Sequence, residues 1–374
     1  MSQQLEARRR AGLPILDLTE SNPTRCGLSY PDDILSVLGK PESLVYEPSP
    51  KGMLPARQAV AAYYAGKGVS VDPDQIILTA STSEAYSFLF RLLANPGDCV
   101  LVPRPSYPLL DFLATINDVE LVAYPLVYSG QWHIDLTDIH RLITARTRAI
   151  VVVSPNNPTG SWLHRQELSE LVAACRAHGL ALICDEVFAD YPFSTNADRV
   201  VTVAGATDVL AFALGGISKL LGLPQMKLAW LCASGPAGLL GEALARLEVI
   251  ADTYLSVNTP VQHALPRWMA QRVRLSQPIL SRVLVNRQYL LNRLKATSTC
   301  ECLDAEGGWY AVIRVPCTYP EEELVLTLLE QDGVLIHPGY FFDFAADGYL
   351  VASLLPPPDV FQAGIEKILH RVGD

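Results

Sequence analysis

Two lysines lie eight residues apart in an apolar stretch punctuated by glycine and proline, LGGISKLLGLPQMKLAW at residues 214–230. A lysine on such a background either extends its amine to the surface or keeps it in a pocket for chemistry. Lys219 follows the apolar run VLAFAL and a pair of glycines. A lysine in such a place can have a lowered pKa and act as a nucleophile toward a carbonyl carbon.

Three other polar clusters also follow apolar runs directly. Ser81, Thr82 and Ser83 come after IILT and open a helical pattern, where a helix N-terminus favours a phosphate, although the same residues are ordinary N-caps. Asn157 belongs to PNNPTG after AIVVVS, and that motif by itself is consistent with a plain turn. Asp185 ends LALICD, and a carboxylate there needs a partner or a function because an unpaired buried charge is costly.

The elements that must position these residues form an α/β pattern. From about residue 75, nearly continuous apolar runs alternate with helical patterns such as SEAYSFLFRLLANPGD; the runs are QIILT, CVLVP, VELVAYPL, AIVVVS, LALICDE, VLAFAL and KLAWLCAS. Such runs are typical of parallel strands buried on both faces by helices. Function in open α/β sheets gathers past the carboxyl ends of the strands, so we expect the four clusters to converge. A phosphate site, a carboxylate and an amine together match the requirements of pyridoxal phosphate (PLP).

A second, smaller α+β domain is expected beyond residue 258. A long helical stretch is followed there by GGWYAVIRV, a helix over EEELVLTLLEQDG, the strands VLIHP and YLVASLL, and a last helix. We therefore expect a large PLP-binding domain over residues 45–258 and a small domain formed by residues 1–44 and 259–374.

The motifs TxSTSEA, PSYP, NNPTG, DEVF and GISK, in this order, resemble the fold-type I PLP-dependent aminotransferases of class I/II, from about residue 20 to the end. The resemblance implies a mostly parallel central sheet sandwiched by helices, a smaller α+β domain, and PLP as the cofactor. It implies that Lys219 forms the Schiff base and moves the proton, that Asp185 holds the pyridine nitrogen protonated, and that Asn157 binds the phenolic oxygen and contacts the substrate.

The resemblance also assigns the phosphate and the faces of the ring. Ser81, Thr82 and Ser83 would bind the phosphate, and Tyr107 would stack on the ring, although it could equally be a packing residue. Lys227 stands where relatives usually have an arginine, so a point charge replaces a bidentate donor at the phosphate. Tyr46 would reach the phosphate of the neighbouring subunit, which implies a homodimer with shared active sites.

Several positions depart from the family pattern. Ser81, Gly216 and Gln225 replace a common glycine, serine and glycine around the phosphate. Phe188 stands where relatives place a tyrosine that donates to the phenolic oxygen. Without that donor we expect a raised Schiff-base pKa, which absorbance titration of wild type against Phe188→Tyr would test.

The usual arginine for the substrate carboxylate is missing, because YLVASLL puts Val351 at its position. Either Arg25 takes over this role, with Arg314 as a weaker candidate, or the substrate is not an ordinary α-amino acid. For Arg25, an ordinary surface arginine is the other interpretation.

The leading function is therefore an aminotransferase that moves an amino group from an amino acid to a 2-oxo acid through a PLP Schiff base on Lys219. The alternative is a PLP-dependent lyase, decarboxylase or oxidase, which the Val351 and Phe188 departures keep open. A non-enzymatic PLP-binding regulatory module and an NAD-binding Rossmann enzyme fit less well, since the chain lacks room for an added DNA-binding domain and shows no GxGxxG after its early strands.

Composition restricts the partners of the 374-residue chain. The net charge of -10 and pI of about 5.2 argue against nucleic acid, and no apolar run is long enough for a membrane span. The N-terminus lacks the apolar segment of a secretory signal. Eight cysteines without a CxxC pair are typical of a reduced, cytoplasmic protein and make a metal site improbable.

Overall fold

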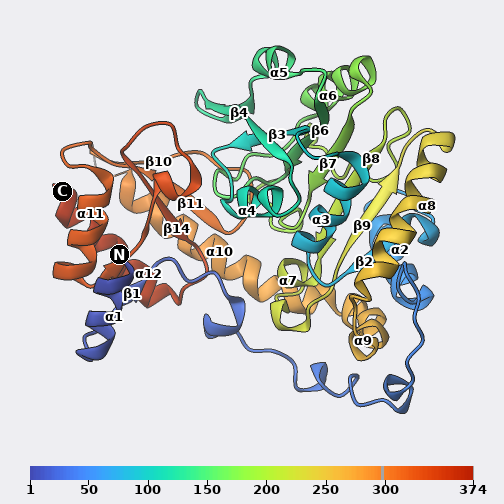
Figure 1. Cartoon of the computed structure of the whole chain (residues 1–374). Coiled ribbons are helices and arrows are strands. Elements are labelled where there is room, and N and C mark those ends of the chain that lie inside the picture. The colour runs from blue at the N-terminus through green and yellow to red at the C-terminus, as the bar shows by residue number, and fades with distance from the viewer. Residues whose placement is uncertain (296–298, 374) are drawn as a thin grey trace.

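The computed structural model describes residues 1–295 and 299–373, and their strands form three sheets (Figure 1). The largest has eight strands in the order β2-β9-β8-β7-β6-β3-β4-β5, the second has the order β10-β11-β14-β13, and the third pairs β1 with β12. The strands are β1 Leu16–Asp17, β2 Ile76–Thr79, β3 Cys99–Arg104, β4 Glu120–Tyr128, β5 Trp132–Ile134, β6 Thr147–Val153, β7 Ala181–Asp185, β8 Ala211–Gly216, β9 Ala229–Ser234, β10 Glu301–Cys302, β11 Tyr310–Arg314, β12 Val334–Leu335, β13 His337–Pro338 and β14 Tyr349–Ser353.

The helices cover these sheets. They are α1 Ser2–Arg10, α2 Leu54–Gly66, α3 Thr82–Leu93, α4 Leu109–Thr115, α5 Leu136–Leu142, α6 Arg165–His178, α7 Ile217–Leu220, α8 Ala237–Tyr254, α9 Thr259–Ala270, α10 Arg272–Leu294, α11 Glu321–Thr327 and α12 Pro358–Val372, with short 3-10 helices that include η1 Pro23–Arg25, η3 Pro41–Leu44 and η5 Pro224–Met226. No helix within the described ranges combines the length and apolar character needed to cross a membrane.

The large sheet is mostly parallel, as the sequence predicts. The pairs β4-β3, β3-β6, β6-β7 and β7-β8 are parallel, whereas β9 runs antiparallel to both β8 and β2, and β5 is antiparallel to β4. The predicted apolar runs coincide with these strands, apart from the short β5, which no apolar run predicts. Because β7 and β8 are buried along their whole length, both faces of the sheet must be covered.

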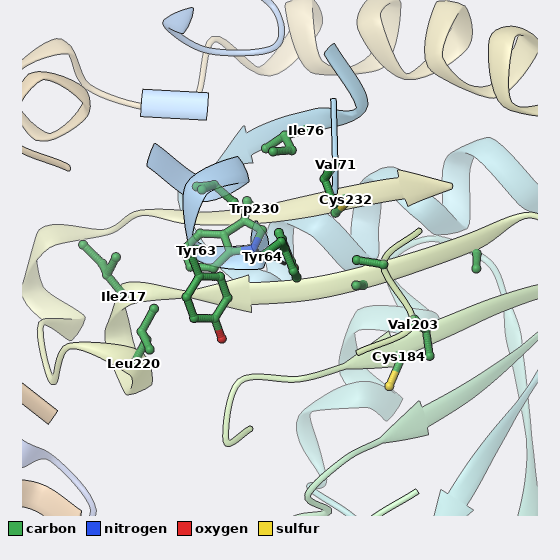
Figure 2. Packing of buried hydrophobic residues seen from close by; sticks show 14 of the residues in the cluster. Tyr63, Tyr64, Val71, Ile76, Cys184, Val203, Ile217, Leu220, Trp230 and Cys232 are labelled. Carbon is green, nitrogen blue, oxygen red and sulfur yellow. Dashed lines mark hydrogen bonds between the residues drawn. The ribbon is translucent and has the colours of Figure 1, made fainter. Parts of the chain in front are cut away.

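Helices sandwich the large sheet. Helices α3 and α8 pack on one face, and α2, α5, α6 and α9 contribute to the apolar core on the other. Figure 2 shows the second core from close by, with Tyr63 and Tyr64 of α2 against Trp230 of β9. The Trp230 indole N–H donates to the Tyr64 hydroxyl at 3.1 Å, so the buried polar atoms of this contact satisfy each other.

The second unit combines the antiparallel four-stranded sheet with α10 and α12. Apolar side chains of both helices share one core with β11 and β14. The long helical stretch expected after residue 258 is divided at Gln271 into α9 and α10, and α10 reaches from the core around Trp230 to the core that it shares with β11 and β14. This long helix therefore links the two sheets (Figure 1).

The domain division at residues 44/45 and 258/259 stays a proposal, and the packing favours a shift of its boundaries. Ile34 and Val37 belong to the core of the large sheet, together with apolar residues of α9. The Trp268 indole N–H of α9 donates to the Ile34 carbonyl oxygen at 3.0 Å. We therefore propose that residues 31–44 and α9 move with the large sheet.

Candidate active site

One cavity of about 330 Å³ at the carboxyl edge of the large sheet brings together most of the predicted site residues. Those that line it are Ser81, Thr82, Ser83, Tyr107, Asn157, Asp185, Lys219 and Lys227. Strand β7 ends at Asp185, Asn157 follows β6, Tyr107 follows β3, and α7 follows β8. These four strands are parallel neighbours, so their carboxyl ends meet at one edge.

Lys219 is positioned by the apolar residues on either side of it. Ile217 and Leu220, three residues apart on α7, are buried in the core shown in Figure 2. Helical spacing therefore turns Lys219 away from that core and into the cavity. Its Nζ lies 5.2 Å from the ring centroid of Trp309 and 5.8 Å from that of Phe188. Burial lowers the pKa of the Lys219 amine, although the negative charge of Asp185 acts in the opposite direction.

Asp185 is a buried carboxylate with few donors. Burial raises its pKa from 3.8 to about 6, while hydrogen bonds and the charge of Lys219 hold it down. The Val187 backbone N–H donates to its Oδ1 at 3.1 Å, and the Tyr86 hydroxyl reaches its Oδ2 at 3.3 Å. At neutral pH the group is mostly ionised, so this cavity contains an anion that can bind a cationic ring nitrogen.

The N-terminus of α3 forms the wall that suits a phosphate. Ser81 is the N-cap, and its Oγ accepts from the Glu84 backbone N–H at 3.2 Å. The hydroxyls of Thr82 and Ser83 line the cavity, and the first N–H groups of a helix lack intrahelical acceptors. Lys227 lies on the cavity with a left-handed backbone (φ 53°) directly after η5, and adds a positive charge.

The polar groups of the cavity fit PLP. Asn157 and Ser106 each have a buried side-chain oxygen that lacks a hydrogen-bond partner among the described residues. A polar ligand in the cavity could satisfy both atoms. An amine for the aldehyde, a carboxylate for the pyridine nitrogen and a helix N-terminus for the phosphate complete the set.

A second, more open cavity of about 420 Å³ adjoins the first. The two share Ser21, Lys219 and Pro224, so the amine faces both. The second cavity is also lined by Asp17 and Glu20 of the N-terminal segment. Space for a substrate beside the Lys219 amine is therefore available on the side of the N-terminal segment.

Two predicted site residues lie away from this cavity. Tyr46 is 70% exposed and lines a different depression, together with Leu255 and Gln262. Arg25 is exposed on η1 and lines neither of the two cavities that contain Lys219. The candidate Arg314 is paired with Glu301 at the surface.

Val351, at the position of the missing arginine, is fully buried on β14 between Val312 and His337. Among the described residues that line the two cavities, Lys219 and Lys227 are the cationic ones. No arginine of the described residues therefore lines either cavity in the single chain.

Several residues of the site were not predicted from the sequence. Tyr86 lies one helical turn after Thr82, and this spacing could have identified it. Trp309, Tyr310 and Ser21 come from segments that only the tertiary structure brings to the cavity, so no local signal pointed to them.

Comparison with known proteins identifies the family. The family model "Aminotransferase class I and II" matches residues 40–356. The chain is 28% identical over 371 residues to the glutamate-pyruvate aminotransferase AlaA of Haemophilus influenzae, covering 97% of this chain and 92% of the relative. It is 30% identical over 369 residues to the alanine aminotransferase of Mycobacterium tuberculosis, covering 96% of this chain and 85% of the relative.

Solved structures agree in fold. An aminotransferase from Escherichia coli superposes with a TM-score of 0.89 at 26% identity, covering 99% of this chain and 94% of the other. The alanine aminotransferase from Pyrococcus furiosus gives the same TM-score at 24% identity, with the same coverage of both chains. The lyase, decarboxylase or oxidase alternative is not favoured by these relatives. The chain belongs to the class I and II aminotransferases and is a PLP-dependent aminotransferase that moves an amino group from an amino acid to a 2-oxo acid.

Proposed function

We propose that Lys219 carries the PLP Schiff base of this aminotransferase and moves the proton during amino transfer. The observation that supports this most directly is the Lys219 amine, buried in the same cavity as the Asp185 carboxylate, with a lowered pKa. A lowered pKa increases the fraction of neutral amine, which is the form that attacks a carbonyl carbon and accepts a proton. Bound PLP supplies an electron sink for the charge left when the substrate Cα–H bond breaks.

The other cavity residues have supporting roles in this proposal. Asp185 keeps a proton on the ring nitrogen, Asn157 donates to the phenolic oxygen and contacts the substrate, and Tyr107 stacks on the ring. Ser81, Thr82, Ser83 and Lys227 hold the phosphate. Tyr107 is 47% exposed in the single chain, which leaves its ring free to stack on a ligand.

Alanine and glutamate are the proposed amino donors, with pyruvate and 2-oxoglutarate as acceptors. The support is the names of the relatives, which include glutamate-pyruvate and alanine aminotransferases. A panel of single amino acids added to the purified holoenzyme would test this proposal. The correct donor bleaches the visible Schiff-base band without any 2-oxo acid, and a panel in which neither alanine nor glutamate does so contradicts the proposed pair.

The assignment of Lys219 has a direct test. Borohydride reduction followed by peptide mapping should place the cofactor on Lys219. The Lys219→Ala variant should lose the visible band, whereas Lys227→Ala should retain it with weaker cofactor binding. Cofactor attached to another lysine would refute the assignment.

The binding of the substrate carboxylate stays a proposal. Arg25 lies on the N-terminal segment that lines the second cavity, next to Asn22 and Pro23. We propose that it approaches the substrate when this segment closes over the site. Arg25→Ala should then raise the KM for the amino acid with little change in kcat. An unchanged KM would contradict this role, and the missing arginine at Val351 would then indicate a substrate other than an ordinary α-amino acid.

A homodimer with shared active sites is also a proposal. Its support is exposed apolar surface around Tyr46: Leu44 is 91% exposed, Val45 62% and Leu255 69%. Soluble monomers rarely expose such groups together. Light scattering of the purified protein would measure the mass, and a monomer would exclude shared sites. A cytoplasmic location is the accompanying proposal, which cell fractionation would test.

A further inference from the structure

Phe188 leaves one wall of the cofactor cavity without a hydroxyl group. Its ring is buried and packs edge-on against Trp309, with centroids 5.4 Å apart and the planes at 67°. It also packs edge-on against Tyr310, with centroids 6.3 Å apart and the planes at 87°. Phe188 therefore contributes apolar surface to the cavity, whereas the neighbouring ring of Tyr310 carries a hydroxyl group.

Tyr310 points into the same cavity from the other sheet. It begins β11 of the four-stranded sheet and lines the cavity together with Asn157 and Lys219. Burial raises the pKa of Tyr310 to about 12, against hydrogen bonds with the side chains of Ser21 and Asn157 that lower it. The hydroxyl is therefore protonated at neutral pH and available as a hydrogen-bond donor.

The chemistry of the cofactor leaves one polar atom for these groups. Lys219 would hold the aldehyde carbon, Asp185 would face the ring nitrogen, and the start of α3 would hold the phosphate. The remaining atom is the phenolic oxygen, which Asn157 is proposed to bind. Tyr310 lines the same cavity as Asn157 and packs edge-on against Phe188, so its hydroxyl lies on the side from which it can donate to the same oxygen.

We propose that the Tyr310 hydroxyl donates a hydrogen bond to the phenolic oxygen of PLP and so supplies, from β11, the donor that is missing at Phe188. This inference rests on the proposed roles of Lys219 and Asn157. It reduces the rise in Schiff-base pKa that is expected from Phe188 alone, since the phenolic oxygen then has a second donor beside Asn157. The donor also belongs to the smaller sheet, so its distance from the cofactor depends on how the two sheets sit against each other.

The pKa of the Lys219 Schiff base reports this hydrogen bond. A donor to the phenolic oxygen withdraws negative charge that would otherwise stabilise the protonated imine. Tyr310→Phe should therefore raise the Schiff-base pKa by about one unit, the size expected for a hydrogen bond to a charged atom. Absorbance titration of the holoenzyme without substrate measures this pKa, and titration of the apoenzyme with PLP measures cofactor affinity, which should weaken by about tenfold.

Variants at two other positions complete the experiment. The exchange Phe188→Tyr with Tyr310→Phe should bring the Schiff-base pKa back toward the wild-type value. Tyr124→Phe is the matched control, since it removes a buried hydroxyl that donates to the Val151 carbonyl oxygen outside this cavity. It should leave the pKa unchanged.

The outcomes separate this inference from the proposed function. A wild-type protein without a visible band after addition of PLP contradicts the proposed function itself. A normal band whose pKa is the same in Tyr310→Phe overturns only the role of Tyr310, as does a variant that changes the KM alone. If Tyr310→Phe does not fold, the Schiff-base pKa of the Phe188→Tyr variant tests the role of Tyr310 instead. If the Phe188→Tyr variant lowers the Schiff-base pKa by much less than about one unit, the phenolic oxygen already accepts a hydrogen bond from Tyr310 in the wild type. A decrease of a full unit overturns the role of Tyr310.

Discussion

Glu186 lies next to Asp185 but faces the opposite side of the sheet, so its replacement tests the electrostatics of the core without touching the cofactor cavity. Successive residues of β7 alternate between the α3 face and the α2 face of the large sheet. Asp185 lies on the α3 face, and the carboxylate of Glu186 therefore lies on the α2 face. The Val203 backbone N–H donates to its Oε1 at 2.7 Å, and the Thr202 hydroxyl donates to its Oε2 at 2.7 Å. Glu186 is only 7% exposed.

Burial raises the pKa of Glu186 from 4.5 to about 7, although Lys67 and the two hydrogen bonds act against it. The folded protein therefore binds this proton more tightly than the unfolded chain does. The stability contributed by Glu186 is greatest at low pH and is lost as the pH rises from about 4.5 to about 7. The shift corresponds to about 3 kcal/mol, most of which is lost between about pH 5 and pH 8.

Glu186→Gln removes this titration and preserves the shape of the side chain. Its amide oxygen can accept from Val203, and its NH₂ group can donate to the Thr202 hydroxyl oxygen. Relative to wild type, the variant should gain about 2.5 kcal/mol of unfolding free energy between about pH 5 and pH 8. Urea unfolding at fixed protein concentration measures this difference, with the exposed Glu322→Gln as control. A difference that stays constant with pH would refute the reasoning.

Four further outcomes are expected. Asn286→Ala leaves two buried carbonyl oxygens without their amide donor, so urea unfolding should show a loss of about 3 kcal/mol, whereas the exposed Gln288→Ala on the same helix should change little. Gly307→Ala should destabilise by about 2 kcal/mol or more, because the new Cβ would lie 2.7 Å from a backbone oxygen and 2.9 Å from an indole ring. Gly241→Ala on α8, with no atom within 4 Å of the new Cβ, should instead raise the unfolding free energy by about 1 kcal/mol. Asp185→Asn should slow amino transfer by at least about a hundredfold in a steady-state assay and keep the visible cofactor band; normal turnover would exclude its proposed role.

The sequence by itself determined the α/β class, the strands of the large sheet apart from β5, and the edge at which the chemistry gathers. Each of these depends on local patterns: an apolar run predicts a buried strand, and the polar residues after it must lie at the carboxyl end of that strand. For this reason the local pattern alone predicts that Ser81, Asn157, Asp185 and Lys219 lie together, and they line one cavity.

Only the tertiary structure decided what faces these residues across the cavity. Tyr310 and Ser21 come from the smaller sheet and from the N-terminal segment, and Trp309 packs over the Lys219 amine although 90 positions separate the two in the chain. Arg25 occupies a surface position instead of a cavity wall. Such contacts depend on how two separate cores pack against each other, and no local periodicity encodes that arrangement, because each core is satisfied by its own apolar residues.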